Sequence, residues 1–218
     1  MLSGANQNQV FGQLVYNDKI TKSGQGGKVY NFVDKEINWA TGRLTSKSLP
    51  TLSAKRVYVL TTDNTASSSE LLINALRGID VDVIQIGTTT TGKPYGFSPE
   101  ANCGSVYYTI QFKSINAKGF GDFADGFIPT PAKNIVSSNI GIDDKVEGCV
   151  VADDLSKPLG SPSEGMLSAA LNYMVTDGAC PPTPAVAPAP RAMPMLDGTP
   201  LNQGIDPLRQ EAIHVNIN

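Results

Sequence analysis

The sequence has little of what metal enzymes, membrane proteins and nucleic-acid-binding proteins need. It contains one histidine, His214, and its three cysteines lack metal-ligand spacing, so a zinc site is not expected. No apolar run approaches the ~20 residues of a membrane-spanning helix. The first residues lack the basic-then-apolar layout of a signal peptide. The longest basic run is Lys55-Arg56 and the formal net charge is −3, which argues against a nucleic-acid partner.

The composition is that of a folded chain whose C-terminal end differs from the rest. The chain is 40% hydrophobic and 17% charged, which is enough apolar material to bury a core. Seven prolines fall within residues 181–200, and no apolar periodicity continues beyond them. We therefore expect one ordered domain over 1–180 and an extended or disordered, proline-rich tail over 181–218.

The centre of the chain predicts an α/β fold. Residues 56–62 and 81–87 are apolar runs typical of buried strands, and 66–77 has the periodicity of an amphipathic helix. Two parallel strands joined by a helix form a right-handed βαβ unit.

The flanking regions carry weaker patterns. Apolar alternation predicts a half-buried strand over 105–113, with Val106, Tyr108, Ile110 and Phe112 on its buried face. N-terminal to the centre we expect a strand over 9–18, a loop over 19–27, a short strand or edge segment over 28–39 and a connection over 40–54. C-terminal to it we expect a glycine-rich loop over 119–131 and a helix over 162–175, with Ser161 as its cap and Gly178 as its stop.

Ser67 is the first candidate catalytic residue, because it lies where the strand gives way to the helix. The unpaired N–H groups and positive dipole of a helix N-terminus, including the Ser68 N–H, stabilise a developing anion. The same residues have a structural interpretation, since Ser67-x-x-Glu70 is also a capping box. The local pattern alone favours the cap.

Lys93 is the second candidate, in the turn TTTTGKPYG that follows the next strand. A turn lysine is usually solvated, and a lysine titrates near ~10.4, so a lysine acting as a base near pH 7 must be buried among apolar side chains. Weaker candidates are the acidic pair Asp153-Asp154, interpreted as a turn, and Asp122 and Asp125 in the glycine-rich loop.

The run VYVLTTDNTASSSELLINALR…VIQIGTTTTGKPYGF resembles peptidase family S41, the C-terminal processing (tail-specific) proteases. The family pattern S/T-A-S-A-S-E matches TASSSE at 65–70 and carries the nucleophile onto Ser67. The family's Gly-Lys pair matches Gly92-Lys93, which lies 26 residues beyond Ser67 (93 − 67).

The resemblance implies a ClpP/crotonase-like core and a serine endopeptidase that works through a Ser67/Lys93 dyad and an acyl-enzyme. Ser68, Glu70 and Gly92 then supply or support the oxyanion site, and the substrate is a protein or peptide bound as an extended strand. Three alternatives remain: a catalytically inactive peptide- or ligand-binding module of the same fold, an acyl-CoA enzyme of the crotonase fold, and a structural or interaction protein.

The resemblance has departures and further implications. Many members have a glutamine four residues after the lysine, where this chain has Phe97. Members normally have an upstream export segment, often a PDZ domain, and a glycine-rich oxyanion loop, so we expect this chain to be the C-terminal part of a larger protein. The family implies a bacterial periplasmic, envelope-lipoprotein or secreted location. The cysteines alone allow one disulfide or three thiols, and an oxidising location favours a Cys149–Cys180 or Cys103–Cys149 bridge.

Overall fold

The computed structural model describes residues 8–24, 26–52, 54–176 and 178–181. The chain divides into two units, and the described part of the second unit is residues 34–50. All other described residues belong to the first unit. The predicted proline-rich tail lies outside the described residues, apart from Pro181.

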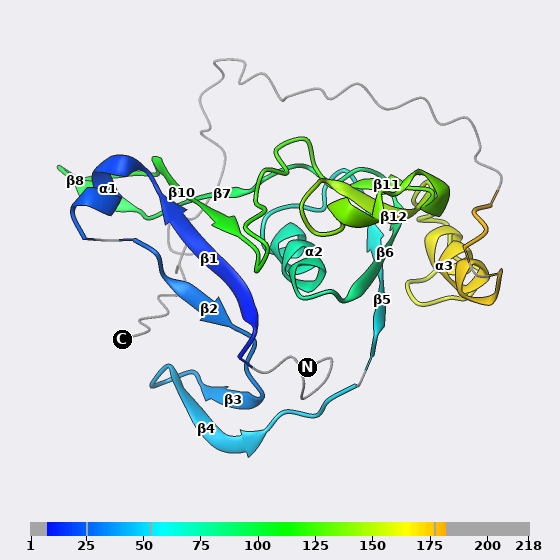
Figure 1. Ribbon diagram of the computed structural model, residues 1–218, viewed down its shortest axis with the longest axis horizontal. Helices are drawn as coiled ribbons and strands as arrows, with labels where there is room; N and C mark the ends of the chain where they lie inside the picture. Colours follow the sequence, from blue (N-terminus) through cyan, green and yellow to red (C-terminus); the bar gives the residue numbers. More distant parts are fainter. Residues whose placement is uncertain (1–7, 25, 53, 177, 182–218) are drawn as a thin grey trace. The chain divides into compact units, whose positions relative to one another are not determined.

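The first unit contains a four-stranded parallel sheet in the order β11-β12-β6-β5 (Figure 1). The strand β5 (Arg56–Thr61) pairs along its whole length with β6 (Asp82–Gly87), and α2 (Ser68–Gly78) connects them. The predicted βαβ unit is therefore confirmed. The other two strands are β11 (Ile128–Thr130) and β12 (Lys145–Val150).

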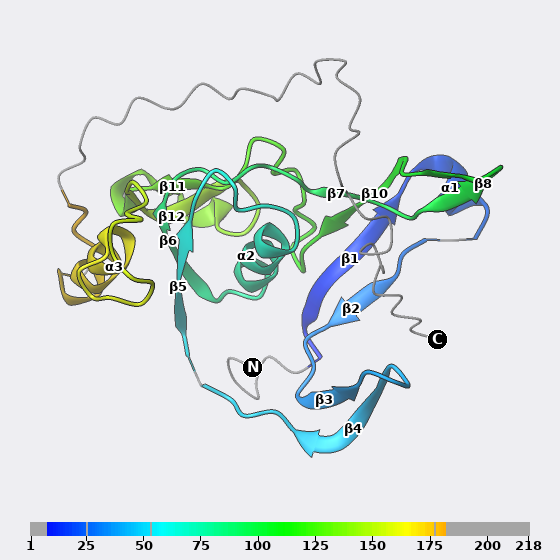
Figure 2. The same ribbon diagram turned by 180° about the vertical axis from the view of Figure 1, so that it is seen from behind.

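Helices cover both faces of this sheet. Successive side chains of a strand point to opposite faces, so neighbouring residues of one strand pack against different helices. Val83 of β6 packs on the α2 face and Ile84 on the face of α3 (Gly165–Thr176). Figure 2 shows the two helices on opposite sides of β5 and β6. The core under α2 consists of Ile73, Leu76, Val81, Val83, Phe123, Phe127 and Val146, and the core under α3 of Ile84, Ile86, Cys149, Met166, Ala169, Ala170 and Tyr173.

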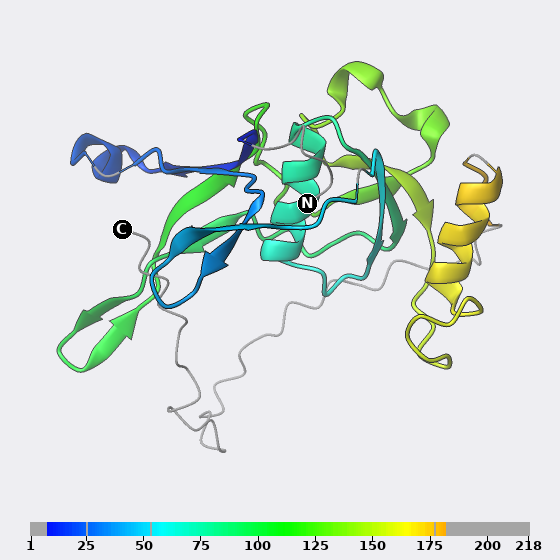
Figure 3. The ribbon, with the colours of Figure 1, turned by 90° about the horizontal axis from the view of Figure 1, so that it is seen from below.

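A second, antiparallel sheet has the order β2-β1-β10-β7. Its strands are β2 (Val29–Asn31), β1 (Val10–Tyr16), β10 (Ile110–Ile115) and β7 (Tyr95–Phe97), which confirms the strand predicted over 9–18. The helix α2 also contacts β1 and β10, so it lies between the two sheets (Figure 3). The strand β7 is an edge of this sheet and follows directly on the Lys93 turn.

Two predictions near the N-terminal end were wrong. The expected loop over 19–27 contains part of a short helix, α1 (Asp18–Lys22), whose first N–H groups are capped by the Asn17 side chain. The expected connection over 40–54 contains β4 (Arg43–Ser48), which forms a hairpin with β3 (Lys35–Asn38) in the second unit. The turn of this hairpin is built by the side chain of Asn38, which accepts the N–H groups of Ala40 and Thr41.

The single strand predicted over 105–113 was also wrong. The segment forms β9 (Ser105–Tyr107), which pairs with β8 (Glu100–Asn102), and then the separate strand β10. Cys103 and Gly104 both have positive φ, as a two-residue hairpin turn requires. Val106, Tyr108 and Ile110 are 50%, 54% and 61% exposed, because none of the hydrophobic core described above covers this hairpin.

The helix predicted over 162–175 exists as α3, but its cap is Glu164 and not Ser161. The Glu164 carboxylate accepts the N–H groups of Met166 and Leu167. The predicted stop, Gly178, has φ +107° and donates its N–H to the Tyr173 carbonyl. No helix in the described ranges is long and apolar enough to cross a bilayer.

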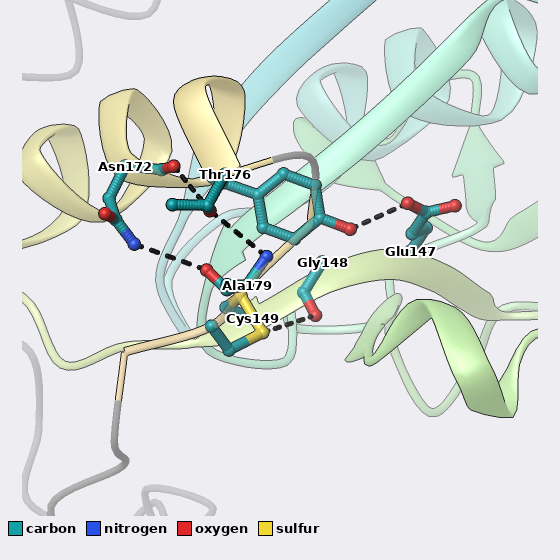
Figure 4. The surroundings of a disulfide bond; sticks show 8 residues. Glu147, Gly148, Cys149, Asn172, Thr176 and Ala179 are labelled. Carbon is teal, nitrogen blue, oxygen red and sulfur yellow. Dashed lines mark hydrogen bonds between the residues drawn. A yellow bond between two sulfur atoms is a disulfide. The ribbon is translucent and has the colours of Figure 1, made fainter.

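A disulfide joins Cys149 of β12 to Cys180, just after α3 (Figure 4). The segment that carries Cys180 is held against the helix end, because the Thr176 hydroxyl accepts the Ala179 N–H and the Asn172 side chain donates to the Ala179 carbonyl. Of the two pairings that the sequence left open, the structure contains Cys149–Cys180, and Cys103 is an exposed free thiol.

Candidate active site

Ser67 lies on a sharp turn between β5 and α2, in a backbone conformation that L-residues rarely adopt. Its φ is +57° and its ψ is −115°. Such a conformation costs about 1–3 kcal/mol and persists only where the surroundings enforce it. A serine on a strained strand-to-helix turn, with its hydroxyl exposed, is the arrangement that hydrolases use to present a nucleophile.

The predicted Ser67-x-x-Glu70 capping box is present, but one of its two contacts is weak. The Ser67 N–H donates to Oε2 of Glu70 at 2.9 Å, as a capping box requires. The reciprocal contact is loose: the Ser67 hydroxyl faces the Glu70 N–H but makes no cap hydrogen bond of ordinary geometry. The Ser68 N–H donates to no group in the described part of the chain. The helix therefore begins with a loosely held hydroxyl at Ser67 and an N–H at Ser68 without a partner among the described residues.

Glu70 does more than cap the helix. Its carboxylate is completely buried. Oε1 accepts the Thr90 hydroxyl and the Gly92 N–H, each at 2.6 Å. Oε2 accepts the Lys93 N–H at 2.8 Å in addition to the Ser67 N–H. Because both N–H groups donate to one oxygen, the backbone nitrogens of Ser67 and Lys93 can be no farther apart than the sum of 2.9 Å and 2.8 Å.

The turn that carries Lys93 packs closely against the glycine-rich loop. Gly92 has φ +81°, and a Cβ there would lie 2.1 Å from the Ala124 carbonyl oxygen. Gly126 also has φ +81°, and its Cβ would lie 2.0 Å from the Thr90 carbonyl oxygen. Both positions therefore need glycine, for conformation and for space.

Ser67 and Lys93 line one pocket of about 280 Å³ within the first unit. The pocket lies between the start of α2, the Lys93 turn and one face of the antiparallel sheet. No hydrogen bond joins the Ser67 hydroxyl to the Lys93 amine among the residues described. The lining residues are Leu14, Ser67, Ser68, Leu71, Lys93, Pro94, Tyr95, Gly96, Phe97, Phe112, Ser114 and Phe123.

The burial that a neutral lysine requires is not found, since the Lys93 side chain is exposed. Phe97, in the place where many S41 proteases have glutamine, packs edge-on against Tyr108. It offers no polar atom that could orient the amine.

The weaker candidates do not join this site. Asp122 pairs with Lys113 at the surface. Asp154 accepts hydrogen bonds from the hydroxyl and the N–H of Ser156. These two hydrogen bonds lower the pKa of Asp154 below its ordinary value, and the hydrogen bond from the hydroxyl has the larger effect. The turn predicted there is confirmed. His214 lies outside the described residues.

No protein-family profile matches the chain, and no curated protein does. Among solved structures, one from Bacteroides fragilis NCTC 9343, described as "Putative S41 protease", matches with a TM-score of 0.57 and 23% sequence identity. The match covers 82% of this chain and 40% of that chain. The chain has an S41-like fold.

The expected resemblance to S41 proteases is thus confirmed for the fold. The chain spans less than half the length of this S41 structure. The identity between the two is too low to transfer activity, so the roles of Ser67, Ser68, Glu70, Gly92 and Lys93 remain predictions, now with a geometry that brings them together.

Proposed function

We propose that the protein is a serine endopeptidase of the S41 type, in which Ser67 is the nucleophile and Lys93 the general base. The observation that carries this proposal is the Glu70 carboxylate, which holds the backbones of both residues on one oxygen and at one pocket. Fixed geometry between a nucleophile and its base is the first requirement of such a dyad.

The proposed reaction proceeds through an acyl-enzyme. The Lys93 amine, in its neutral form, takes the proton of the Ser67 hydroxyl while Oγ attacks the scissile carbonyl carbon. The Ser68 N–H, at the positive end of α2, stabilises the resulting oxyanion. The carbon–nitrogen bond then breaks as the lysine ammonium protonates the leaving amine. Water, deprotonated by Lys93, then attacks the ester carbonyl carbon. The bond from this carbon to Ser67 Oγ breaks, the lysine ammonium returns the proton to Oγ, and the second product leaves with a free carboxyl group. No metal or organic cofactor takes part in this scheme.

The substrate is proposed to bind as an extended strand along the open edge of β7, as peptides commonly add to sheet edges. The edge runs directly from Lys93 past the pocket, so a peptide there would cover the exposed amine and remove water from it. Desolvation by the substrate, or by a part of a larger protein, would supply the burial that the described residues lack.

We also propose a ClpP/crotonase-like core and a location in the cell envelope or outside the cell. The parallel βαβ sheet supports the first proposal. The Cys149–Cys180 disulfide supports the second, because structural disulfides persist in oxidising compartments. Fractionation of the native host, with antibody detection in the cytosolic and envelope fractions, tests the location.

The catalytic proposal is tested with an unstructured protein substrate and a fluorophosphonate probe. Ser67→Ala and Lys93→Ala should each lower hydrolysis by at least about 10³-fold and abolish labelling. Ser69→Ala is the matched control in the same turn of α2 and should label normally. Hydrolysis that survives in both Ser67→Ala and Lys93→Ala would exclude the dyad.

A specific observation favours a second function, that of a peptide-binding module without catalysis. Lys93 is exposed and makes no hydrogen bond to the Ser67 hydroxyl. If this function is correct, calorimetry should detect peptide binding that Ser67→Ala leaves unchanged, while the fluorophosphonate labels nothing.

A further inference from the structure

The Lys93 side chain needs a polar partner if it is to act on Ser67 in a defined direction. A lysine has four rotatable side-chain bonds and loses considerable rotamer freedom when it is fixed. Glu70 holds the backbone of Lys93 but does not contact its amine. A group on another element must therefore orient the amine.

Ser114 is the buried polar side chain that lines the pocket. It is 8% exposed. The other polar side chains of the lining, besides Lys93 itself, are Ser67, Ser68 and Tyr95, and all three are exposed. Phe97 packs on Tyr108 and carries no polar atom. The Ser114 hydroxyl makes no hydrogen bond to any described residue, so its donor and its acceptor sites are both unused.

The position of Ser114 in the sheet brings it next to the Lys93 turn. Ser114 lies on β10 and donates its N–H to the carbonyl of Pro94, the residue after Lys93, at 3.5 Å. The strand β1 bounds the hydroxyl from the other side, because a Cβ at Gly12 would lie 2.9 Å from the Ser114 Oγ. The space that remains open to this hydroxyl is the pocket that Lys93 also lines.

We propose that Ser114 is a positioning residue for Lys93, whose hydroxyl hydrogen-bonds the lysine amine and turns it toward Ser67. The hydroxyl makes no hydrogen bond to a described residue, so it is free to accept one from the amine. The contact forms when the amine swings inward, as it does when a substrate covers it. This inference rests on the proposed function.

Threonine and valine at position 114 provide the matched test, because they have the same shape and only threonine keeps the hydroxyl. In peptide hydrolysis, Ser114→Thr should retain kcat within about threefold, whereas Ser114→Val should lose roughly 10–100-fold in kcat with little change in KM. A hydroxyl favours the charged form of an amine that it contacts. The acid limb of the pH–rate profile should therefore move to lower pH in Ser114→Val by about half a unit, which a general loss of structure would not produce.

A second measurement does not depend on hydrolysis. In protein labelled with ¹³Cε-lysine and saturated with a substrate-like peptide, the Lys93 resonance should have the same titration midpoint in wild type and Ser114→Thr and a lower one in Ser114→Val. Gly12→Ala, whose methyl group presses on the Ser114 hydroxyl, should shift the midpoint in the same direction. Tyr95→Phe removes the exposed hydroxyl of the pocket and should leave the titration midpoint of Lys93 unchanged.

Equal kcat values and equal midpoints in the threonine and valine variants would overturn the positioning role, as would a midpoint that moves in Tyr95→Phe and not in Ser114→Val. If wild type neither hydrolyses peptide nor reacts with a fluorophosphonate, the proposed function fails. The lysine titration then still decides whether Ser114 contacts Lys93.

Discussion

The backbone at Ser67 can be tested for strain by replacing the residue with glycine. A φ of +57° costs an L-residue about 1–3 kcal/mol, and glycine adopts it freely. Glycine in turn costs about 0.4–1 kcal/mol, because it adds conformational freedom to the unfolded chain. We therefore expect Ser67→Gly to raise the free energy of unfolding by about 1 kcal/mol. Ser67→Ala keeps the strained Cβ and loses only a loose cap contact, so its stability should change by less than ~0.5 kcal/mol.

The capping interpretation predicts that both variants lose stability. At an ordinary N-cap, serine to alanine costs about 0.5–2 kcal/mol and serine to glycine a few tenths. Urea unfolding separates the two, since 1 kcal/mol moves the midpoint by about 0.5 M for a slope near 2 kcal/mol/M. Ser69→Gly, in the first turn of the same helix, is the control and should lose about 0.5 kcal/mol. If Ser67→Gly also lowers the midpoint, the inference of strain is wrong.

Four further predictions follow from the contacts around the site and the core. Glu70→Gln should lower the free energy of unfolding in urea by about 2–4 kcal/mol, since an amide NH₂ would face N–H and hydroxyl groups that now donate hydrogen bonds to the carboxylate. Unchanged stability would show that these four hydrogen bonds do not hold the two turns together. Gly92→Ala should lose about 2–4 kcal/mol, against about 1 kcal/mol for Gly104→Ala, which has a similar φ but nothing within 4 Å of its Cβ; equal losses would show that crowding at Ala124 is unimportant. Cys180→Ser should cost about 3–4 kcal/mol, as the chain-entropy estimate gives for a bridge across a sequence separation of 31, and wild type in reductant should match it. Burial and, to a smaller extent, the hydrogen bond to Glu147 raise the pKa of Tyr173 above its ordinary value of 10. The stability that the neutral Tyr173 contributes is complete below pH 10 and is lost as the pH rises beyond 10, because the unfolded chain loses the proton first. The urea midpoint of wild type should therefore fall more steeply above pH 10 than that of Tyr173→Phe.

The elements that could be predicted from the sequence are those whose apolar residues meet the main core. The strands β5 and β6 are apolar runs flanked by helices, and α2 and α3 have helical periodicity, so pattern and packing agree there. The hairpin of β3 and β4 was missed because most of its strand residues are exposed and none is buried, and a strand without a buried face has no apolar alternation. The hairpin of β8 and β9 shows the reverse failure. Its alternation is real, but none of the core covers the apolar face.

The candidate site divides in the same way. Ser67, Glu70 and Lys93 could be selected from local motifs. The hydrogen bonds that Glu70 accepts from Thr90, Gly92 and Lys93 could not, since they depend on how the Lys93 turn packs against α2. Ser114 had no sequence signal at all, because a lone serine in a strand acquires meaning only from the pocket around it.

The burial of Glu70 has a consequence for the motion of the protein. The N–H groups of Gly92 and Lys93 belong to the lysine turn, yet both donate to the carboxylate of Glu70, which is completely buried. They can exchange with deuterium only when the carboxylate releases them, and the same event frees the amide of Ser67. The start of the helix and the lysine turn therefore open together, as a single local unfolding step.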